Sequence, residues 1–209
     1  MAISTSWSPA ATRCMPSRST EAPQARLFKS KREWSAWLEK NHAASSGLWL
    51  RTAKKGSPLK SVSYQEALEV ALCYGWIDGQ KRPENDESWL QRFCPRSARS
   101  VWSKINREKA LALIASGEMK PAGLAAIEDA RSNGRWESAY DSPGNATVPA
   151  DLQAALDASP KAAAFFKTLN RANSYAILWR IQTVKKPETR ARKIEQFVAM
   201  LERHEKLHP

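Results

Sequence analysis

The spacing of apolar residues predicts alternating helices and short strands in the first half of the chain. The S-x-x-E pattern of a capping box begins a helix at Ser30, and a second such box begins a helix at Ser63 that ends at Gly75. Short apolar runs bounded by turn residues predict three strands, over 48–53, 76–82 and 88–94.

Beyond residue 100 the pattern is helical. Ser100 is expected to cap a helix that ends at Gly117, and Pro121 to open one that ends at Gly134. Four further helices are expected, from Pro149, from Pro160, over 175–184 and over 187–205; the last carries an apolar stripe of Ile194, Phe197, Val198 and Leu201. We therefore expect an α+β fold, mostly helical, with a small antiparallel sheet in the N-terminal half.

Three regions are expected along the chain. Residues 1–26 are rich in Ser, Thr, Ala and Pro with little periodicity, which is typical of a disordered tail. Residues 27–140 should form the α+β core. The D-S-P-G-N sequence at 141–145 predicts a loop, after which residues 141–209 should form a helical region packed on that core.

Composition narrows the class of partner. The net charge is +12, which favours polyanions such as nucleic acid, anionic lipid or acidic proteins, although a solvated basic surface without a partner explains the charge equally well. The chain also contains nine tryptophans, which serve either core packing or a ligand-contact surface.

Several classes of function lack support in the sequence. The three cysteines form no C-x-x-C pair or zinc pattern, and reduced thiols favour a cytoplasmic location. Neither a secretory signal nor an apolar run of about 20 residues is present, so no transmembrane segment is expected. The sequence has no G-x-S-x-G, G-x-G-x-x-G or Walker motif, and we expect no cofactor, metal site or catalytic triad.

The sequence C-Y-G-W-I-D-G at 73–79 is the densest group of chemically informative residues. Asp78 lies among aromatic residues and glycines, where apolar neighbours raise the pKa of a carboxyl group toward the range of an acid–base catalyst. An aspartate that accepts hydrogen bonds in a turn explains the same pattern. The hypothesis of a ligand pocket for an unknown small ligand names six residues: Tyr74, Trp76, Asp78, Trp89, Arg96 and Trp102.

Two concentrations of basic residues suggest a site for an anionic partner, with nucleic acid as one alternative. They lie in the turn at 54–60 and around the helix break at Pro187. The candidate residues are Lys54, Lys55, Lys185, Lys186, Arg190 and Arg192.

Three blocks of sequence resemble one known family. They are S-Y-Q-E-A-L followed by A-L-C-Y-G-W-I-D-G over 63–79, then F-C-P-R with S-V-W-S and Asn106, and finally K-P-E-T-R with Lys193 and Ile194. Together they resemble the YdeI/OmpD-associated proteins, also called bacteriocin-protection proteins, from about Leu27 to the C-terminus. Cys94 departs from the threonine of the family pattern, so we do not expect it to be a required group.

This resemblance implies a role in resistance to bacteriocins and cationic antimicrobial peptides. For some members it also implies a porin partner, but such contact would need export, and no signal is visible here. We therefore expect a cytoplasmic binding or stress protein. The alternatives are a nucleic-acid-binding protein that uses its basic, tryptophan-rich surface and an unrecognised enzyme with Asp78 as acid–base.

Overall fold

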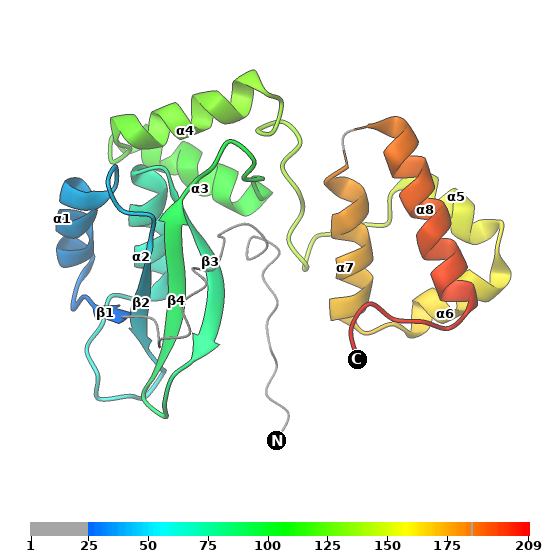
Figure 1. Ribbon diagram of the computed structural model, residues 1–209, viewed down its shortest axis with the longest axis horizontal. Helices are drawn as coiled ribbons and strands as arrows, with labels where there is room; N and C mark the ends of the chain where they lie inside the picture. Colours follow the sequence, from blue (N-terminus) through cyan, green and yellow to red (C-terminus); the bar gives the residue numbers. More distant parts are fainter. Residues whose placement is uncertain (1–24, 185) are drawn as a thin grey trace. The chain divides into compact units, whose positions relative to one another are not determined.

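Four strands form one mixed sheet in the N-terminal half of the chain (Figure 1). The computed structural model describes residues 25–184 and 186–209. The strands are β1 (Ala25–Leu27), β2 (Leu48–Ala53), β3 (Trp76–Pro83) and β4 (Ser88–Pro95), in the order β1-β2-β4-β3. The α+β class is confirmed. The sheet is mixed instead of wholly antiparallel because β1 runs parallel to β2.

The first strand was missed by the sequence prediction. Ala25 and Arg26 were assigned to the tail, whereas the structure pairs them with Trp49 and Leu50 of β2. A strand of three residues is too short to show the alternation on which strand prediction depends. The rest of the predicted tail, residues 1–24, lies outside the described residues.

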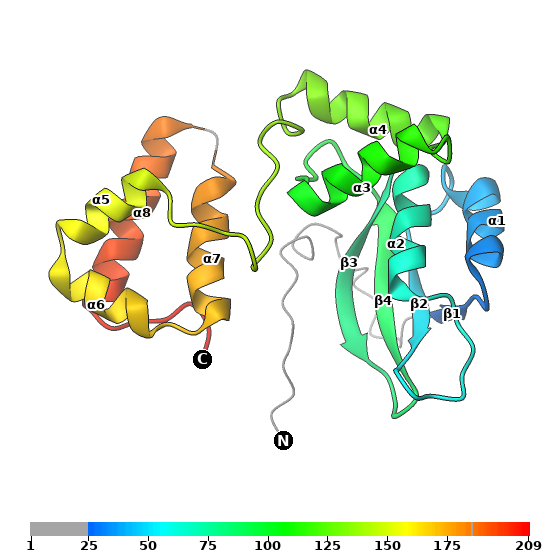
Figure 2. The same cartoon turned by 180° about the vertical axis from the view of Figure 1, so that it is seen from behind.

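Helices α1 (Lys31–Asn41) and α2 (Tyr64–Cys73) lie against one face of the sheet (Figure 2). Both predicted caps are present: the Ser30 hydroxyl accepts a hydrogen bond from the Glu33 amide, and Ser63 forms a reciprocal capping box with Glu66. These caps satisfy amide groups that the first helical turn leaves without partners.

Trp34 is the centre of an aromatic core between these helices and the sheet. Its side chain is 0% exposed, and its Nε1 donates to the Ala67 carbonyl oxygen at 3.0 Å. Its ring centroid lies within 5.1–6.3 Å of those of Phe28, Trp37, Trp76 and Phe93. Trp34 and Trp76 are therefore core residues, and each has a carbonyl acceptor for its buried indole N–H.

The C-terminal end of α2 positions the segment that follows β4. Gly75 ends the helix with φ +71°, and an added Cβ there would lie 2.8 Å from the Ala122 carbonyl oxygen. The Gly75 carbonyl oxygen accepts a hydrogen bond from the Arg96 amide at 2.9 Å. The backbone of Arg96 is thus held at the point where the end of α2 contacts α4 (Pro121–Ser132).

Ser100 does not cap the helix that follows it. Helix α3 (Lys104–Ala115) begins three residues later than a cap at Ser100 would place it, and Trp102 precedes it. The Ser100 hydroxyl instead accepts a hydrogen bond from the Ser97 amide at 3.0 Å, within a turn closed by the Ser100 amide and the Ser97 carbonyl oxygen. A side chain that bonds backward to an earlier residue is not available to cap a later helix.

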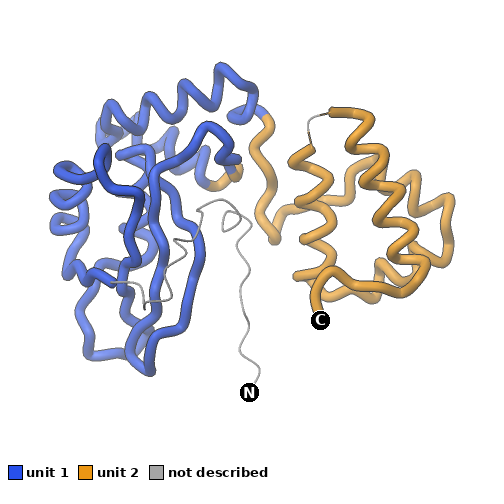
Figure 3. The backbone as a smooth tube through the Cα atoms, viewed as in Figure 1, with its two compact units in different colours: residues 1–102, 106–137 blue, residues 103–105, 138–209 orange. Residues whose placement is uncertain are grey.

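The chain divides into two compact units (Figure 3). Of the described residues, unit 1 comprises 25–102 together with 106–137, and unit 2 comprises 103–105 together with those of 138–209. In unit 2 the segment 103–105 is held by Tyr140, whose carbonyl oxygen accepts from the Lys104 amide at 2.9 Å. Lys104 also forms an ion pair with Asp141 at 2.7 Å. The predicted regions 27–140 and 141–209 stay predictions.

Unit 2 is a helical bundle of α5 (Ala150–Asp157), α6 (Pro160–Thr168), α7 (Arg171–Gln182) and α8 (Pro187–Glu202). The apolar stripe predicted for α8 faces its core, since Ile194, Phe197 and Leu201 are buried. The core residues are Leu152, Leu156, Ala162, Ile177, Leu178, Ile181, Ile194, Phe197 and Leu201.

Candidate functional site

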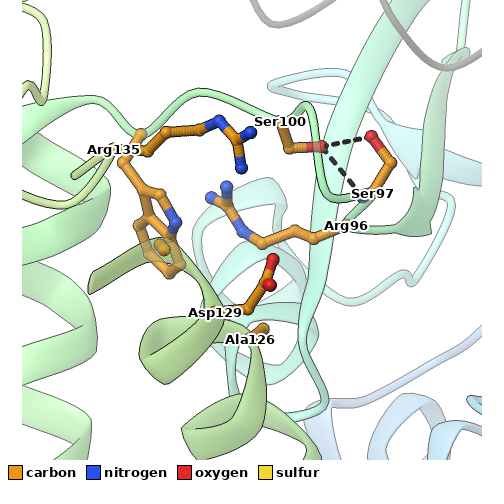
Figure 4. A pocket seen from close by; sticks show the side chains of 8 residues that line it. Arg96, Ser97, Ser100, Ala126, Asp129 and Arg135 are labelled. Carbon is orange, nitrogen blue, oxygen red and sulfur yellow. Dashed lines mark hydrogen bonds between the residues drawn. The ribbon is translucent and has the colours of Figure 1, made fainter. Parts of the chain in front are cut away.

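A small pocket lies in unit 1 between the loop after β4 and the C-terminal end of α4 (Figure 4). Its cavity volume is ≈ 30 Å³, which leaves room for a single small polar group. The lining residues are Arg96, Ser97, Ser100, Trp102, Ala126, Asp129, Ala130 and Arg135. Below it is called the arginine pocket.

Arg96 is held flat against an indole. Its guanidinium carbon lies 3.5 Å from the ring centroid of Trp102, and Nη1 donates to the Val101 carbonyl oxygen at 3.3 Å. Trp102 is 2% exposed and packs edge-on against Trp136 at 4.8 Å. A cation over a buried aromatic face is attracted by the ring quadrupole, so this stacking fixes the plane of the Arg96 side chain.

Arg135 brings a second positive charge to the same pocket. Figure 4 shows its guanidinium group turned toward that of Arg96, with the Asp129 carboxylate on the other side of Arg96. The pocket therefore contains two cations and one carboxylate. Two like charges that face each other across a partly enclosed space repel, and an anion bound between them offsets this repulsion by attracting both.

The serine turn supplies hydroxyl groups at the edge of the pocket. The Oγ atoms of Ser97 and Ser100 lie 3.2 Å apart, so one hydroxyl donates to the other. Each also accepts from a backbone amide, Ser97 from Arg99 at 3.3 Å and Ser100 from Ser97 at 3.0 Å. The hydroxyl that accepts within the pair keeps its own hydrogen, which is available to a bound oxygen atom.

Asp78 is a buried carboxyl group that feels the charge of Arg96. It is 6% exposed, and the Tyr64 hydroxyl donates to its Oδ2 at 2.8 Å. Burial raises the pKa of the Asp78 carboxyl, while the Tyr64 hydrogen bond and the charge of Arg96 act in the opposite direction. Arg96 therefore lines the arginine pocket and also interacts electrostatically with the buried Asp78 carboxyl group.

The six predicted ligand-pocket residues are distributed among different environments. Arg96 and Trp102 meet in the arginine pocket, while Trp89 lies beside Tyr64, the partner of Asp78, at a ring distance of 5.9 Å. Trp76 is 1% exposed in the aromatic core, where its Nε1 donates to the His42 carbonyl oxygen at 3.1 Å. An indole that is so completely enclosed serves packing instead of a contact surface. Whether the other residues bind a ligand stays a prediction.

Tyr74 lines a different site from Arg96. It lies on a groove beside α1, described below, and its hydroxyl donates to Glu39. Sequence reasoning also missed Arg135, Asp129 and Tyr64. The first two are far from Arg96 along the chain and carry no motif, so only the fold brings them together.

The basic candidates belong to two separate units. Lys54 and Lys55 are exposed in unit 1, and Lys186 and Arg192 are exposed in unit 2, while Lys185 lies outside the described residues. A nucleic-acid surface made from both groups stays a prediction.

Arg190 has a structural role that the sequence did not indicate. Its guanidinium group forms two bonds to Asp151, at 2.6 and 2.9 Å, and a third to the Ile181 carbonyl oxygen at 2.7 Å. These contacts link α8 to α5 and α7, and they occupy much of the donor capacity that an anion would need.

Cys73 is expected to resist alkylation in the folded protein. The thiol is 6% exposed, and burial raises its pKa to about 11, so the reactive thiolate is scarce at pH 8. Iodoacetamide at pH 8 should label Cys73 slowly in the native protein and rapidly in 6 M guanidinium chloride, as measured by mass spectrometry of the peptide that contains it. Equal labelling rates in both conditions would contradict this prediction.

Among residues 25–184 and 186–209, no helix has both the length and the apolar character to cross a membrane. The same part of the chain contains no group of three or more His, Cys, Asp or Glu side chains arranged to hold a metal ion.

Two family models match the chain in different places. Residues 26–126 match a domain of unknown function, DUF8412, and residues 145–204 match OmdA, described as "Bacteriocin-protection, YdeI or OmpD-Associated". Of the blocks noted in the sequence, those before residue 107 fall in the first match and the K-P-E-T-R block in the second. No curated protein and no solved structure matches the chain.

Proposed function

Because residues 145–204 match the model of the bacteriocin-protection, YdeI or OmpD-associated family, we propose that this chain is a cytoplasmic protection protein that binds an anionic ligand in its arginine pocket. The family match supports the biological role. The pocket of unit 1 supports the kind of ligand.

One observation carries the proposal: the guanidinium groups of Arg96 and Arg135 are directed at a single pocket. Guanidinium groups bind carboxylate and phosphate oxygens through two parallel N–H bonds, and their geometry is fixed before the ligand arrives when the side chain is stacked on a ring. Arg96 has this stacking on Trp102. The small volume of the pocket fits one carboxylate or phosphate group, with the remainder of the ligand outside.

Protection through direct capture of a cationic peptide is disfavoured by charge. The chain carries a net charge of +12, and like charges slow the encounter of two molecules and weaken their complex. An anionic cellular ligand avoids this repulsion. The proposed role is therefore indirect: the protein responds to, or sequesters, an anionic molecule of the cell instead of the peptide itself.

Replacing Arg135 with glutamine should weaken the binding of inorganic phosphate about tenfold or more. The change removes one charge-assisted hydrogen-bond donor group, which typically contributes about 1.5–3 kcal/mol. Isothermal titration calorimetry at low ionic strength measures this loss.

Arg99→Gln is the matched control, because Arg99 is an exposed arginine of the same loop that does not line the pocket. It removes the same unit of charge and should change the phosphate affinity less than twofold. Equal losses in both variants, or no phosphate binding by the unmodified protein, would contradict the proposal. Tight binding of a single-stranded oligonucleotide that Arg135→Gln does not affect, and that falls steeply with salt, would favour the nucleic-acid alternative.

A further inference from the structure

A second and much larger recess lies on unit 1, between α1 and the N-terminal end of α4. Its volume is ≈ 560 Å³, and it is wide open to solvent, so a ligand bound there would stay partly exposed. Its lining residues are Lys31, Arg32, Ser35, Ala36, Glu39, Tyr74 and Lys120, and it is called the α1–α4 groove below.

The floor of the groove is a fixed polar network. The Tyr74 hydroxyl donates to Glu39 at 2.5 Å and lies 3.3 Å from the Ser35 hydroxyl. Tyr74 is only 5% exposed, and burial together with the Glu39 hydrogen bond raises its pKa. The phenol of Tyr74 therefore keeps its proton. Glu39 is the only carboxylate that lines the groove, and one of its oxygens already accepts this hydrogen bond.

The walls of the groove carry positive charge on two different helices. Lys31 and Arg32 project from α1, and Lys120 is the N-cap residue of α4. Lys31 is neutralised by Glu118 at 2.9 Å. Arg32 and Lys120 are exposed, and within the described part of the chain neither forms an ion pair.

The N-terminal end of α4 adds to this positive wall. Lys120 makes no side-chain cap, and Pro121, the first helical residue, has no N–H group. The partial positive charge of the helix end therefore has no acidic side chain in its first turn to balance it. The helix end therefore adds to the positive potential of Lys120, but the side chains of Arg32 and Lys120 supply most of the positive charge of the groove.

We propose that the α1–α4 groove binds a small polyanion, a compact molecule with at least two carboxylate or phosphate groups. Arg32 on α1 and Lys120 on α4 pair with the two anionic groups. Ala36 and the edge of Tyr74 contact the frame between them, while the Ser35 hydroxyl donates to the Tyr74 oxygen and helps to fix the floor of the groove. Two cations on different helices and a recess far larger than the arginine pocket favour a ligand with two anionic groups over a single oxyanion.

This site differs from the arginine pocket in its residues, so the two can be tested separately. Citrate and pyrophosphate serve as the probes, because they present the shared chemistry as carboxylates and as phosphates respectively. Binding to the full-length protein is followed by calorimetry and by the amide resonances of Ser35, Ala36 and Lys120 in ¹⁵N-labelled protein. At least one probe is expected to shift these resonances at submillimolar concentration.

Arg32→Gln and Lys120→Gln should each weaken this binding about tenfold. Lys40→Gln is the matched control, because Lys40 is an exposed lysine of α1 outside the groove, and it should change the affinity less than twofold. Arg135→Gln should leave the groove resonances responsive, so failure of the arginine pocket and failure of the groove are distinguishable. Preference for citrate or for pyrophosphate identifies the ligand class.

Two results would overturn the proposal. One is an equal loss of affinity in Lys40→Gln, which would mean that the probes respond only to overall charge. The other is the absence of shifts at Ser35, Ala36 and Lys120 with both probes. Circular dichroism of each variant shows that a loss of affinity does not come from unfolding, since the exchanged side chains of Arg32, Lys40 and Lys120 are all exposed.

Discussion

Replacing Trp34 with alanine should destabilise unit 1 by about 3–5 kcal/mol, the usual cost of removing a fully buried large aromatic side chain. Trp34 is 0% exposed and contacts aromatic residues from α1 and from two strands. The change would leave a cavity between the helices and the sheet, and it would deprive the Ala67 carbonyl oxygen of the indole donor.

Trp37→Ala is the control for this prediction. Trp37 stacks on Trp34 at 5.5 Å, but it is only half-buried, so the same deletion removes less buried surface. Because the chain has two units that need not unfold together, stability is best measured by hydrogen exchange of the β4 amides. A loss below about 1 kcal/mol, or a loss no greater than that of Trp37→Ala, would show that the aromatic core is not the main source of stability.

The substitution Gly47→Ala should destabilise unit 1 by about 3 kcal/mol, which combines backbone strain with overpacking. Gly47 has φ +119°, a conformation that L-residues rarely adopt. An added Cβ would also lie 2.5 Å from the Phe93 carbonyl oxygen and 2.8 Å from the Cys94 Cβ. Relief of these contacts requires β4 to move away from the start of β2.

Gly56→Ala separates the two contributions. Gly56 also has a positive φ, +84°, but an added Cβ there meets no atom within 4 Å. This control should cost only the backbone strain, about 1 kcal/mol. Urea denaturation of both variants, followed by the same amide protons of β4, measures the difference. Equal losses would mean that the close approach of Gly47 to β4 adds nothing.

Local sequence signals located much of the N-terminal half correctly. The N-cap at Ser30, the capping box at Ser63 and the apolar runs at β2, β3 and β4 depend on neighbours a few residues apart, and all of them are present in the structure. The capping box expected at Ser30 is only half formed, because the Glu33 carboxylate accepts from the Lys29 amide instead of the Ser30 amide. Features that depend on tertiary context were missed or misassigned. The three-residue β1 has no pattern of its own, and Ser100 resembles a cap until the turn to Ser97 is seen.

The candidate sites were less accessible to sequence reasoning than the elements. Arg96 and Trp102 were identified because they lie in one short segment, but Arg135 completes the pocket from beyond α4. The α1–α4 groove combines Arg32 with Lys120, and nothing in either local sequence relates the two. The sequence also did not show the different roles of Trp76 and Trp102, which both lie next to small residues. Only the fold shows that Trp102 stacks against Arg96, whereas the indole N–H of Trp76 is bonded inside the core.

The short segment 103–105 limits how the chain can be cut into pieces. A fragment that starts at residue 138 contains the whole OmdA match, but it lacks the strand-like partner of Tyr140 and the ammonium group that pairs with Asp141. A cut before residue 138 would leave the Tyr140 carbonyl oxygen without the Lys104 amide and the Asp141 carboxylate without the Lys104 ammonium group. A separately expressed C-terminal fragment therefore needs residues 103–105 attached to it, or a redesigned N-terminal segment, to keep the contacts of Tyr140 and Asp141.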